Sequence, residues 1–517
     1  MKYNRVFIAL LTLFAGAFAV AFGQGSGELG IGYTFMDETG NLSVNQGSFN
    51  EYEGVGISLE NFYYRFNNGI NINADLQNLT LDNRNIRFGL SKPGFFGMNF
   101  NHSQYRRFYD FNGDNYTERK QTGGSVWIMP IKQIKLFASG RFVNRQGEMV
   151  ELFDFVESGA PTSIDYDMRD FKTGIQINHH GNMIRMEYLT MKYETDLSTT
   201  EQDRKQFRIH GFFPIYRFEW IKVHGGFQSF ESEYTDTDRK IESNTGWGGV
   251  NVDLPHNFEL KYSFIFDRTR ASSDTVATDN IAHNFYLSHT MPGKLKATVG
   301  YQNGIQDDYD NAVKANHFYL GLWSKPIDKL TVRGSYGSGR EDVDEGTRHI
   351  GDEERTRIKF SAKYNDEKWG ILQLKYNSKS RENKDLSSDI EYNQFDLHYT
   401  LPIIEYASAT IGYTNTIGEF ENAETAFEFC DNIYYADLNS EYFKKFNLGF
   451  GLDYYRSKRD LDVESINLRF NGSYTFAKGY TFGVEYKVHN FDDLLYYDQY
   501  YTGNIVTVKL SKSLNFN

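Results

Sequence analysis

The stretch that decides the fold is "KFNLGFGLDYY", residues 445–455, in which apolar and polar residues alternate. One parity holds Phe446, Leu448, Phe450, Leu452 and Tyr454, and the other holds Asn447, Gly449, Gly451, Asp453 and Tyr455. Successive side chains of a strand point to opposite faces, so the pattern predicts a strand with one apolar and one polar face. The rest of the sequence indicates what each face meets.

The same alternation recurs along the chain. Further examples lie at 257–267, 294–302, 329–337, 465–476 and 505–516. In the first of these, the apolar parity holds Phe258, Leu260, Tyr262, Phe264 and Phe266. We count about 26 such segments, each about 9 to 15 residues long. Aromatic residues make up 16% of the chain, with 37 Tyr and 43 Phe, and many of them lie on these apolar faces.

The connections between the expected strands alternate in length. Short ones include "KPG" (92–94), "MPGK" (291–294) and "AKG" (477–479), while long polar ones lie near 146–164 and 341–353. Outer-membrane barrels have short periplasmic turns and long external loops. We therefore predict an all-β fold: a transmembrane antiparallel up-and-down β-barrel of about 26 strands with both termini in the periplasm. The location is then the outer membrane of a Gram-negative bacterium.

A soluble all-β protein is the competing interpretation. Such a protein rarely exposes contiguous apolar patches beyond a few hundred Å², which these aromatic faces would form. A closed barrel in lipid accounts for the apolar face and leaves no free strand edge. The N-terminus agrees with export, because Lys2 and Arg5 precede an apolar run and small residues near position 23. We expect residues 1–23 to be a signal peptide and 24–517 to be the barrel.

Several function classes are disfavoured by composition. The net charge of −13 argues against nucleic acid as a partner, since phosphate binding needs a basic surface. Cys430 is the one cysteine, so the chain has no disulfide, no CxxC and no CxxCH haem-attachment motif. No GxSxG, HExxH or P-loop occurs, so we expect no enzymatic activity and no cofactor of its own. If the protein works together with haem, the haem must be carried by a partner protein.

The size of the expected barrel raises the question of what fills it. Strands about 4.8 Å apart and tilted by about 40° give 26 strands a backbone diameter near 50 Å and a lumen of about 30 to 40 Å. Barrels of about 22 strands are already plugged by an additional domain. Here the first strand begins at about Glu28, so we expect no internal plug domain. A separate folded protein of about 100 residues or more would fit the lumen.

The polar parity of the late strands is basic. Inward candidates are Arg357, Lys359, Lys363, Lys375, Lys379 and Arg381, and Lys261, Lys296, Arg333, Arg469 and Lys509 share that parity. This wall would complement an acidic guest, or it would line an anion-preferring channel. A wet wall with local ion pairs is the simplest interpretation. In the opening stretch, Asn447, Gly449, Gly451 and Asp453 face the same way, and their small size favours clearance for a guest.

One loop contains a weak calcium candidate. In "DFNGDN" (110–115), Asp110, Asn112 and Asp114 have the spacing at which a calcium loop begins. Asn115 stands where such a loop has Gly, and Gln121 where it has the bidentate Glu. The acidic external loops, such as "QDDYDN" (306–311), are more simply solvated. We expect no other metal site.

The architecture resembles the MtrB/PioB porins of porin–cytochrome conduits. The resemblance lies in the signal peptide, the absence of a plug and of haem motifs, about 26 strands, and the hairpin "NIRFGLSKPGFFGMNFNHSQYRRFYDFNG" (85–113). It implies an insulating sheath that houses a periplasmic multihaem c-type cytochrome and lets it meet a multihaem cytochrome on the outer surface. The chain lacks the CxxC that some members carry near the mature N-terminus. The alternative is a large diffusion porin or substrate-specific transporter.

Overall fold

The fold is taken from a computed structural model. The residues it describes are 23–42, 51–108, 116–149, 162–195, 201–215, 218–235, 239–272, 278–308, 311–344, 352–385, 387–422, 425–442, 445–476, 479–495 and 500–516. Nearly all of them are strand, because period-2 alternation of apolar and polar residues runs through each segment. A short 3-10 turn, η2 (Pro255–Asn257), lies between two of the strands. No helix of the described residues is long and apolar enough to cross a membrane.

The described residues form one sheet of 26 strands. The first thirteen are β1 (Gly23–Gly40), β2 (Gly54–Phe66), β3 (Asn71–Gln77), β4 (Asn85–Lys92), β5 (Phe96–Phe108), β6 (Tyr116–Ile131), β7 (Ile134–Met149), β8 (Thr162–His179), β9 (Asn182–Thr195), β10 (Glu201–Ile215), β11 (Phe218–Tyr234), β12 (Arg239–Leu254) and β13 (Phe258–Ala271). The others are β14 (Thr278–Met291), β15 (Leu295–Asp308), β16 (Asn311–Ile327), β17 (Leu330–Asp344), β18 (Glu353–Asp366), β19 (Gly370–Asn383), β20 (Ser388–Ile404), β21 (Ala407–Glu421), β22 (Ala426–Tyr442), β23 (Phe446–Arg459), β24 (Val463–Thr475), β25 (Tyr480–Asp493) and β26 (Tyr500–Phe516).

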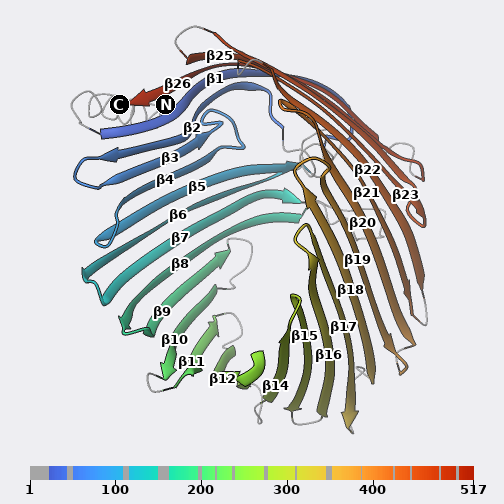
Figure 1. The fold of residues 1–517 in the computed structure, drawn as a ribbon. Helices are drawn as coiled ribbons and strands as arrows, with labels where there is room; N and C mark the ends of the chain where they lie inside the picture. The colour runs from blue at the N-terminus through green and yellow to red at the C-terminus, as the bar shows by residue number, and fades with distance from the viewer. Residues whose placement is uncertain are drawn as a thin grey trace.

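The sheet closes on itself. Each strand pairs antiparallel with the next strand in the chain, as expected for an up-and-down barrel, and β1 pairs with β26 from Gly25↔Phe516 to Gly40↔Tyr501. Figure 1 shows the first and last strands, blue and red, side by side in the wall. Closure gives the backbone groups of both terminal strands a partner and removes the free sheet edges. The predicted all-β closed antiparallel barrel of about 26 strands is confirmed.

The two rims of the barrel differ in their connections. One rim, here called the short-turn rim, has tight turns such as 93–95 and 328–329, and the ends of β1 and β26 lie at this rim. The other, the long-loop rim, carries the longer connections. The strands run further into these connections than the sequence indicated: β15 continues to Asp308 and β16 begins at Asn311, both inside the external loop expected at 306–311. The backbone pairing of β15 with β16 continues beyond the apolar residues, as far as the pair Asp308↔Asn311.

One hairpin is much shorter than its neighbours. β3 has 7 residues and β4 has 8, against 13 in both β2 and β5. Their connection, 78–84, therefore turns back before the neighbouring strands end. Its backbone joins β2 on one side, where Leu79 N donates to Ile57 O at 3.0 Å. On the other side, Gln104 N of β5 donates to Arg84 O at 3.0 Å. The wall thus has a notch at its long-loop rim.

Candidate functional site

The register assigns each side chain to one face of the wall, because residues directly opposite in an antiparallel pair share a face. Phe446 pairs with Tyr474, which pairs with Phe482, and this apolar row continues to Leu510 and Ile31. The alternate row from Asn447 is polar. The recesses described below are concave and are lined by polar-row residues, so the polar row faces the lumen and the apolar row faces outward.

The residues singled out from the sequence divide between these faces as expected from parity. The outward set holds Phe446, Leu448, Phe450, Leu452, Phe258, Leu260, Tyr262 and Phe264. The inward set holds Arg357, Lys359, Lys363, Lys375, Lys379, Arg381, Asn447, Gly449, Gly451 and Asp453. That the outward face meets lipid, and the inward face a partner, stays a prediction.

The outward apolar run has a defined length. On β23 it extends from Phe446 to Tyr454, and the next outward residue is Arg456, which lies 3.3 Å from Glu464. On β13 it extends from Phe258 to Phe266, and Arg268 follows. Both runs match the span of about 9 to 11 residues that a tilted strand needs to cross a bilayer. The wall therefore carries an apolar belt, and charged residues lie between this belt and the long-loop rim.

The glycines of the opening stretch do not provide clearance, which corrects the sequence-based interpretation. A Cβ added to Gly449 would lie 1.9 Å from Asn471 Oδ1, and one added to Gly451 would lie 2.9 Å from Asp437 Oδ1. Both glycines are buried. The space above them is filled by side chains from the neighbouring strands, including the pair of Asp437 with Arg469 at 2.9 Å. The glycines thus let polar side chains lie across β23.

Two adjoining recesses mark the inner wall over β14–β20. Their volumes are about 560 and 820 Å³, and both are lined by Tyr319 and Arg357, so they form one continuous hollow. Its cationic lining residues include Arg333, Arg357, Lys359, Lys375 and Lys379. These five side chains are all exposed to the lumen. We call this hollow the basic trough.

The central cations of the basic trough have no acidic partner. Among the described residues, no carboxylate lies within 4.0 Å of Arg333, Arg357, Lys359, Lys375 or Lys379, whereas such pairs occur elsewhere on the wall. Arg357 stands directly opposite Lys379 in the β18–β19 ladder. Like charges in such pairs are destabilising. The trough therefore maintains an uncompensated positive potential at some cost in stability.

The carboxylate that lines the trough, Asp396, is engaged by neutral groups. Asp396 stands opposite Lys375 in the β19–β20 ladder. It accepts hydrogen bonds from Gln394 Nε2 at 3.1 Å and from Thr414 Oγ1 at 2.9 Å, and it forms no ion pair with Lys375. The lysine therefore stays available to an anion from outside the chain.

Aromatic rings form part of the trough and were missed by the sequence analysis. Tyr286 and Tyr319 pack edge to face with centroids 6.1 Å apart, and Lys379 Nζ lies 5.3 Å from the centroid of the Tyr392 ring. Trp323 lies opposite Arg333. Their inward parity was readable in the sequence, where charge was the signal that marked the candidates on that face. The trough therefore combines cations with planar apolar surfaces.

Elsewhere the wall has many local ion pairs. Glu259 binds Lys261 and Lys296 at 2.9 and 3.0 Å, and Lys509 binds Glu60 at 2.6 Å. At the edge of the trough, buried Glu353 joins the directly opposed Arg355 and Arg381. Such wet, part-exposed pairs contribute little stability each. They show that the wall compensates many of its cations locally, including Lys296 and Arg381 at the margin of the trough, and leaves the five central cations of the trough uncompensated.

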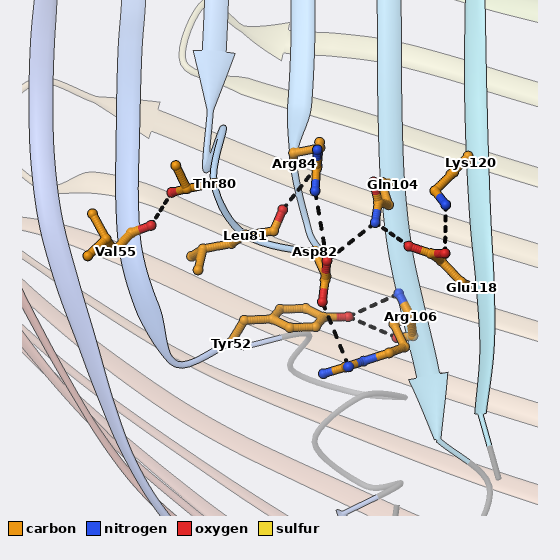
Figure 2. Close-up of polar contacts among 10 residues, drawn as sticks. All are labelled: Tyr52, Val55, Thr80, Leu81, Asp82, Arg84, Gln104, Arg106, Glu118 and Lys120. Atoms are coloured by element: carbon orange, nitrogen blue, oxygen red, sulfur yellow. Dashed lines mark hydrogen bonds and ion pairs between the residues drawn. The ribbon is translucent and has the colours of Figure 1, made fainter. Parts of the chain in front are cut away.

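A second polar cluster fills the notch above β3 and β4 (Figure 2). The segment 51–53, here called the rim strap, crosses it. Tyr52 Oη donates to Arg106 O at 2.9 Å and accepts from Arg106 N at 3.0 Å, so it satisfies the β5 edge where a neighbouring strand is missing. Asp82 lies 3.7 Å from Arg106, and Glu51 lies 2.7 Å from Lys487 of β25. Burial raises the pKa of Tyr52. No sequence pattern marked this strap.

Some predictions fall outside the described residues. The calcium candidates Asp110, Asn112 and Asp114 do, as do residues 1–22 of the expected signal peptide and the greater part of the loop 146–164. Among the residues that are described, no group of three or more His, Cys, Asp or Glu side chains is arranged to hold a metal ion.

Comparison with known proteins supports the fold. No protein-family model and no curated protein matches the chain. Among solved structures, it is similar to the siderophore receptor PirA from Pseudomonas aeruginosa, with a TM-score of 0.53, 11% identity, and coverage of 81% of this chain and 80% of that one. It is also similar to the alcaligin outer membrane receptor FauA from Bordetella pertussis, with a TM-score of 0.53, 9% identity and coverage of 96% and 76%. It is similar as well to the FrpB iron transporter from Neisseria meningitidis, with a TM-score of 0.53, 10% identity, and coverage of 96% of this chain and 82% of that one. The chain thus has the fold of large outer-membrane barrels.

Proposed function

We propose that this barrel is an outer-membrane sheath around a separate protein, a periplasmic multihaem c-type cytochrome that exchanges electrons with an extracellular partner. The observation that carries the proposal is the closed wall of 26 strands. Within the described residues, the chain is used almost entirely for this wall and its connections. A wall of that size encloses a lumen of about 30 to 40 Å, wider than water channels of 16 to 18 strands.

An unfilled lumen of that width would leak solutes, so the proposal requires an occupant. A domain of about 100 residues has a radius of gyration near 13 Å, which fits the lumen. The basic trough favours an occupant with an acidic surface, because its uncompensated cations attract carboxylates. Haem propionates and acidic side chains of a cytochrome would supply such groups.

The role of the chain itself would be mechanical and electrostatic. The apolar belt would contact the lipid, and the closed wall would keep the lipid away from the occupant across a hydrocarbon core about 30 Å thick. We propose that the barrel itself has no catalytic activity and binds no cofactor. The haem groups belong to the occupant, and the resemblance to MtrB/PioB porins supports this assignment.

A second candidate is a substrate-specific transporter for anionic solutes. It is favoured by the fold similarity to a siderophore receptor and an iron transporter. The basic trough, with its cations and aromatic rings, would then bind solute rather than protein. In this case the barrel would be purified without a protein of fixed stoichiometry.

A visible spectrum separates the two candidates. The barrel is purified from its native outer membrane in mild detergent, and the Soret absorbance is measured together with the protein composition. A c-type haem spectrum with one co-purifying protein in fixed ratio to the barrel is expected. Colourless barrel that takes up anions in liposomes would support the transporter and contradict the sheath.

A further inference from the structure

The inner wall is electrically divided. Between β6 and β19 the charged inward positions are mostly basic, and the basic trough lies at the end of this arc. From β22 to β25 the charged inward positions are mostly acidic. The acidic members are Asp431, Asp437, Glu441, Asp453 and Glu485. A strong basic surface and an acidic surface thus lie next to each other around one lumen.

The acidic surface has its own uncompensated charges. Asp453 is exposed on β23, and no cationic side chain of the described residues forms an ion pair with it. Asp431 accepts a hydrogen bond from the neutral Tyr455 hydroxyl at 3.1 Å. Asp437 is the one of these three that has a cation, Arg469, at 2.9 Å. We call Asp431, Asp437 and Asp453 the acidic patch.

The two surfaces are close enough for one protein to contact both. The trough extends to β20, and the acidic patch lies on β22 and β23. Strands are about 4.8 Å apart, so the centres of the two surfaces are separated by about 20 to 25 Å along the wall. A folded domain with a radius of gyration near 13 Å, and hence about 34 Å across, would cover both.

We infer that the wall fixes the rotation of its protein occupant, which docks a carboxylate-rich face on the basic trough and a basic face on the acidic patch. The inference rests on the proposed sheath function and adds which part of the wall the occupant contacts. A wall of uniform charge would attract an acidic protein but would not select an orientation. Opposite potentials side by side penalise the other rotations, because these bring like charges together.

Matched charge variants test the docking. In the test variant Lys359, Lys375 and Lys379 become Gln, which removes three uncompensated cations of the trough. In the control Lys222, Lys261 and Lys509 become Gln, which removes the same charge from inward positions outside the trough that already have carboxylate partners. The native complexes are washed with salt, and the haem absorbance per folded barrel is measured. Folding is checked by the heat-induced gel shift.

The expected result is a loss of retained occupant of about tenfold or more in the test variant, since truncated charge contacts raise the dissociation rate. The control should retain the occupant within about twofold of wild type, as expected for already compensated charges. Equal losses in both would show attraction by total charge and overturn the inference while the sheath stands. Wild-type barrel without any protein occupant would overturn the sheath and the inference together.

Photo-crosslinking tests the orientation in the native complex. A benzoyl-phenylalanine is placed at Asn377 in the trough or at Asn439, which faces inward beside the acidic patch. The crosslinked peptides of the occupant should come from two different faces, with Asp and Glu prevailing in the first set and Lys and Arg in the second. Identical peptides from both positions would mean that the occupant rotates freely, and would overturn the inference.

Discussion

At the scale of single residues, the central feature is the cost of the basic trough. Arg357 and Lys379 oppose each other directly, and no carboxylate of the described residues neutralises either of them. An opposed like-charge pair is destabilising by a fraction of a kcal/mol up to about 1 kcal/mol. A wall that only had to be wet would not require this pair. We attribute it to an anionic partner.

This interpretation predicts a stabilising mutation. Lys379→Gln should raise the free energy of unfolding of the empty, refolded barrel by about 0.2 to 1 kcal/mol, because it removes the repulsion. Arg381→Gln is the matched control, since Glu353 already bridges Arg381 and its loss should be destabilising. The urea midpoint in detergent, followed by the gel shift, measures both. A lower midpoint for Lys379→Gln would contradict the account.

The buried glycines of β23 give a second prediction. Gly449→Val should cost about 1 to 3 kcal/mol, because its side chain would displace Asn471. Gly334→Val on β17 is the control, since a Cβ there meets nothing within 4 Å. The same urea titration applies. Equal stabilities of the two variants would show that the space above Gly449 is open, as the sequence alone had indicated.

At the scale of strands, the rim strap replaces a missing neighbour of β5. Tyr52→Phe removes the hydroxyl that bonds both backbone groups of Arg106, and the unpaired groups should cost about 1 to 3 kcal/mol. Amide exchange at Arg106 should become faster. Tyr63→Phe is the control, because its hydroxyl bonds only an exposed side chain, Asn71. Unchanged exchange at Arg106 would show that the strap does not hold this edge.

The strap should also depend on pH. The pKa of Tyr52 is raised by burial, so the protonated hydroxyl is favoured in the folded state. Its contribution is fully present below the unfolded value near 10, and it is lost as the pH rises through the higher folded value. The protection factor of the Arg106 amide, which corrects for the base catalysis of exchange, should therefore fall only in strongly alkaline solution, and in the Tyr52→Phe variant this fall should be absent.

The outward and inward faces of a strand should differ in how well they tolerate a charged side chain. Leu468→Arg, in the outward row of β24, should cost about 2 to 4 kcal/mol in a bilayer, because the charge lies near the middle of the apolar belt. Asn467→Arg, its inward neighbour, should cost less, about 1 kcal/mol, since the new charge can reach the lumen and the main loss is the hydrogen bond to His489 at 3.0 Å. Folding into liposomes at increasing urea measures both. Equal costs would contradict the assignment of faces.

Much of this architecture was predictable because it depends on local pattern. Alternation gives the strands, and parity correctly grouped Phe446 with Phe450 and Lys359 with Lys375. The notch, the strap and the filled space above Gly449 were not predictable. They depend on contacts between residues far apart in the sequence, such as Glu51 with Lys487. The pairing state of each trough cation likewise depends on the neighbouring strands.

For the whole molecule, the lumen is the feature on which the proposed function depends. The closed wall is wider than that of a diffusion porin, and its inner surface combines a basic trough with an acidic patch. These features favour an occupant that is large, folded and unevenly charged. The apolar belt and the fold similarity to outer-membrane receptors agree with a barrel that crosses a membrane.

The most direct test of the central claim is the mass of the native particle. The barrel is extracted from its own outer membrane in mild detergent and measured by native mass spectrometry. The account predicts a complex in which each barrel carries one additional haem-containing protein, and stripping that protein should open a large, ungated conductance in a planar bilayer. A particle with the mass of the barrel alone, and with a small gated conductance, would contradict it.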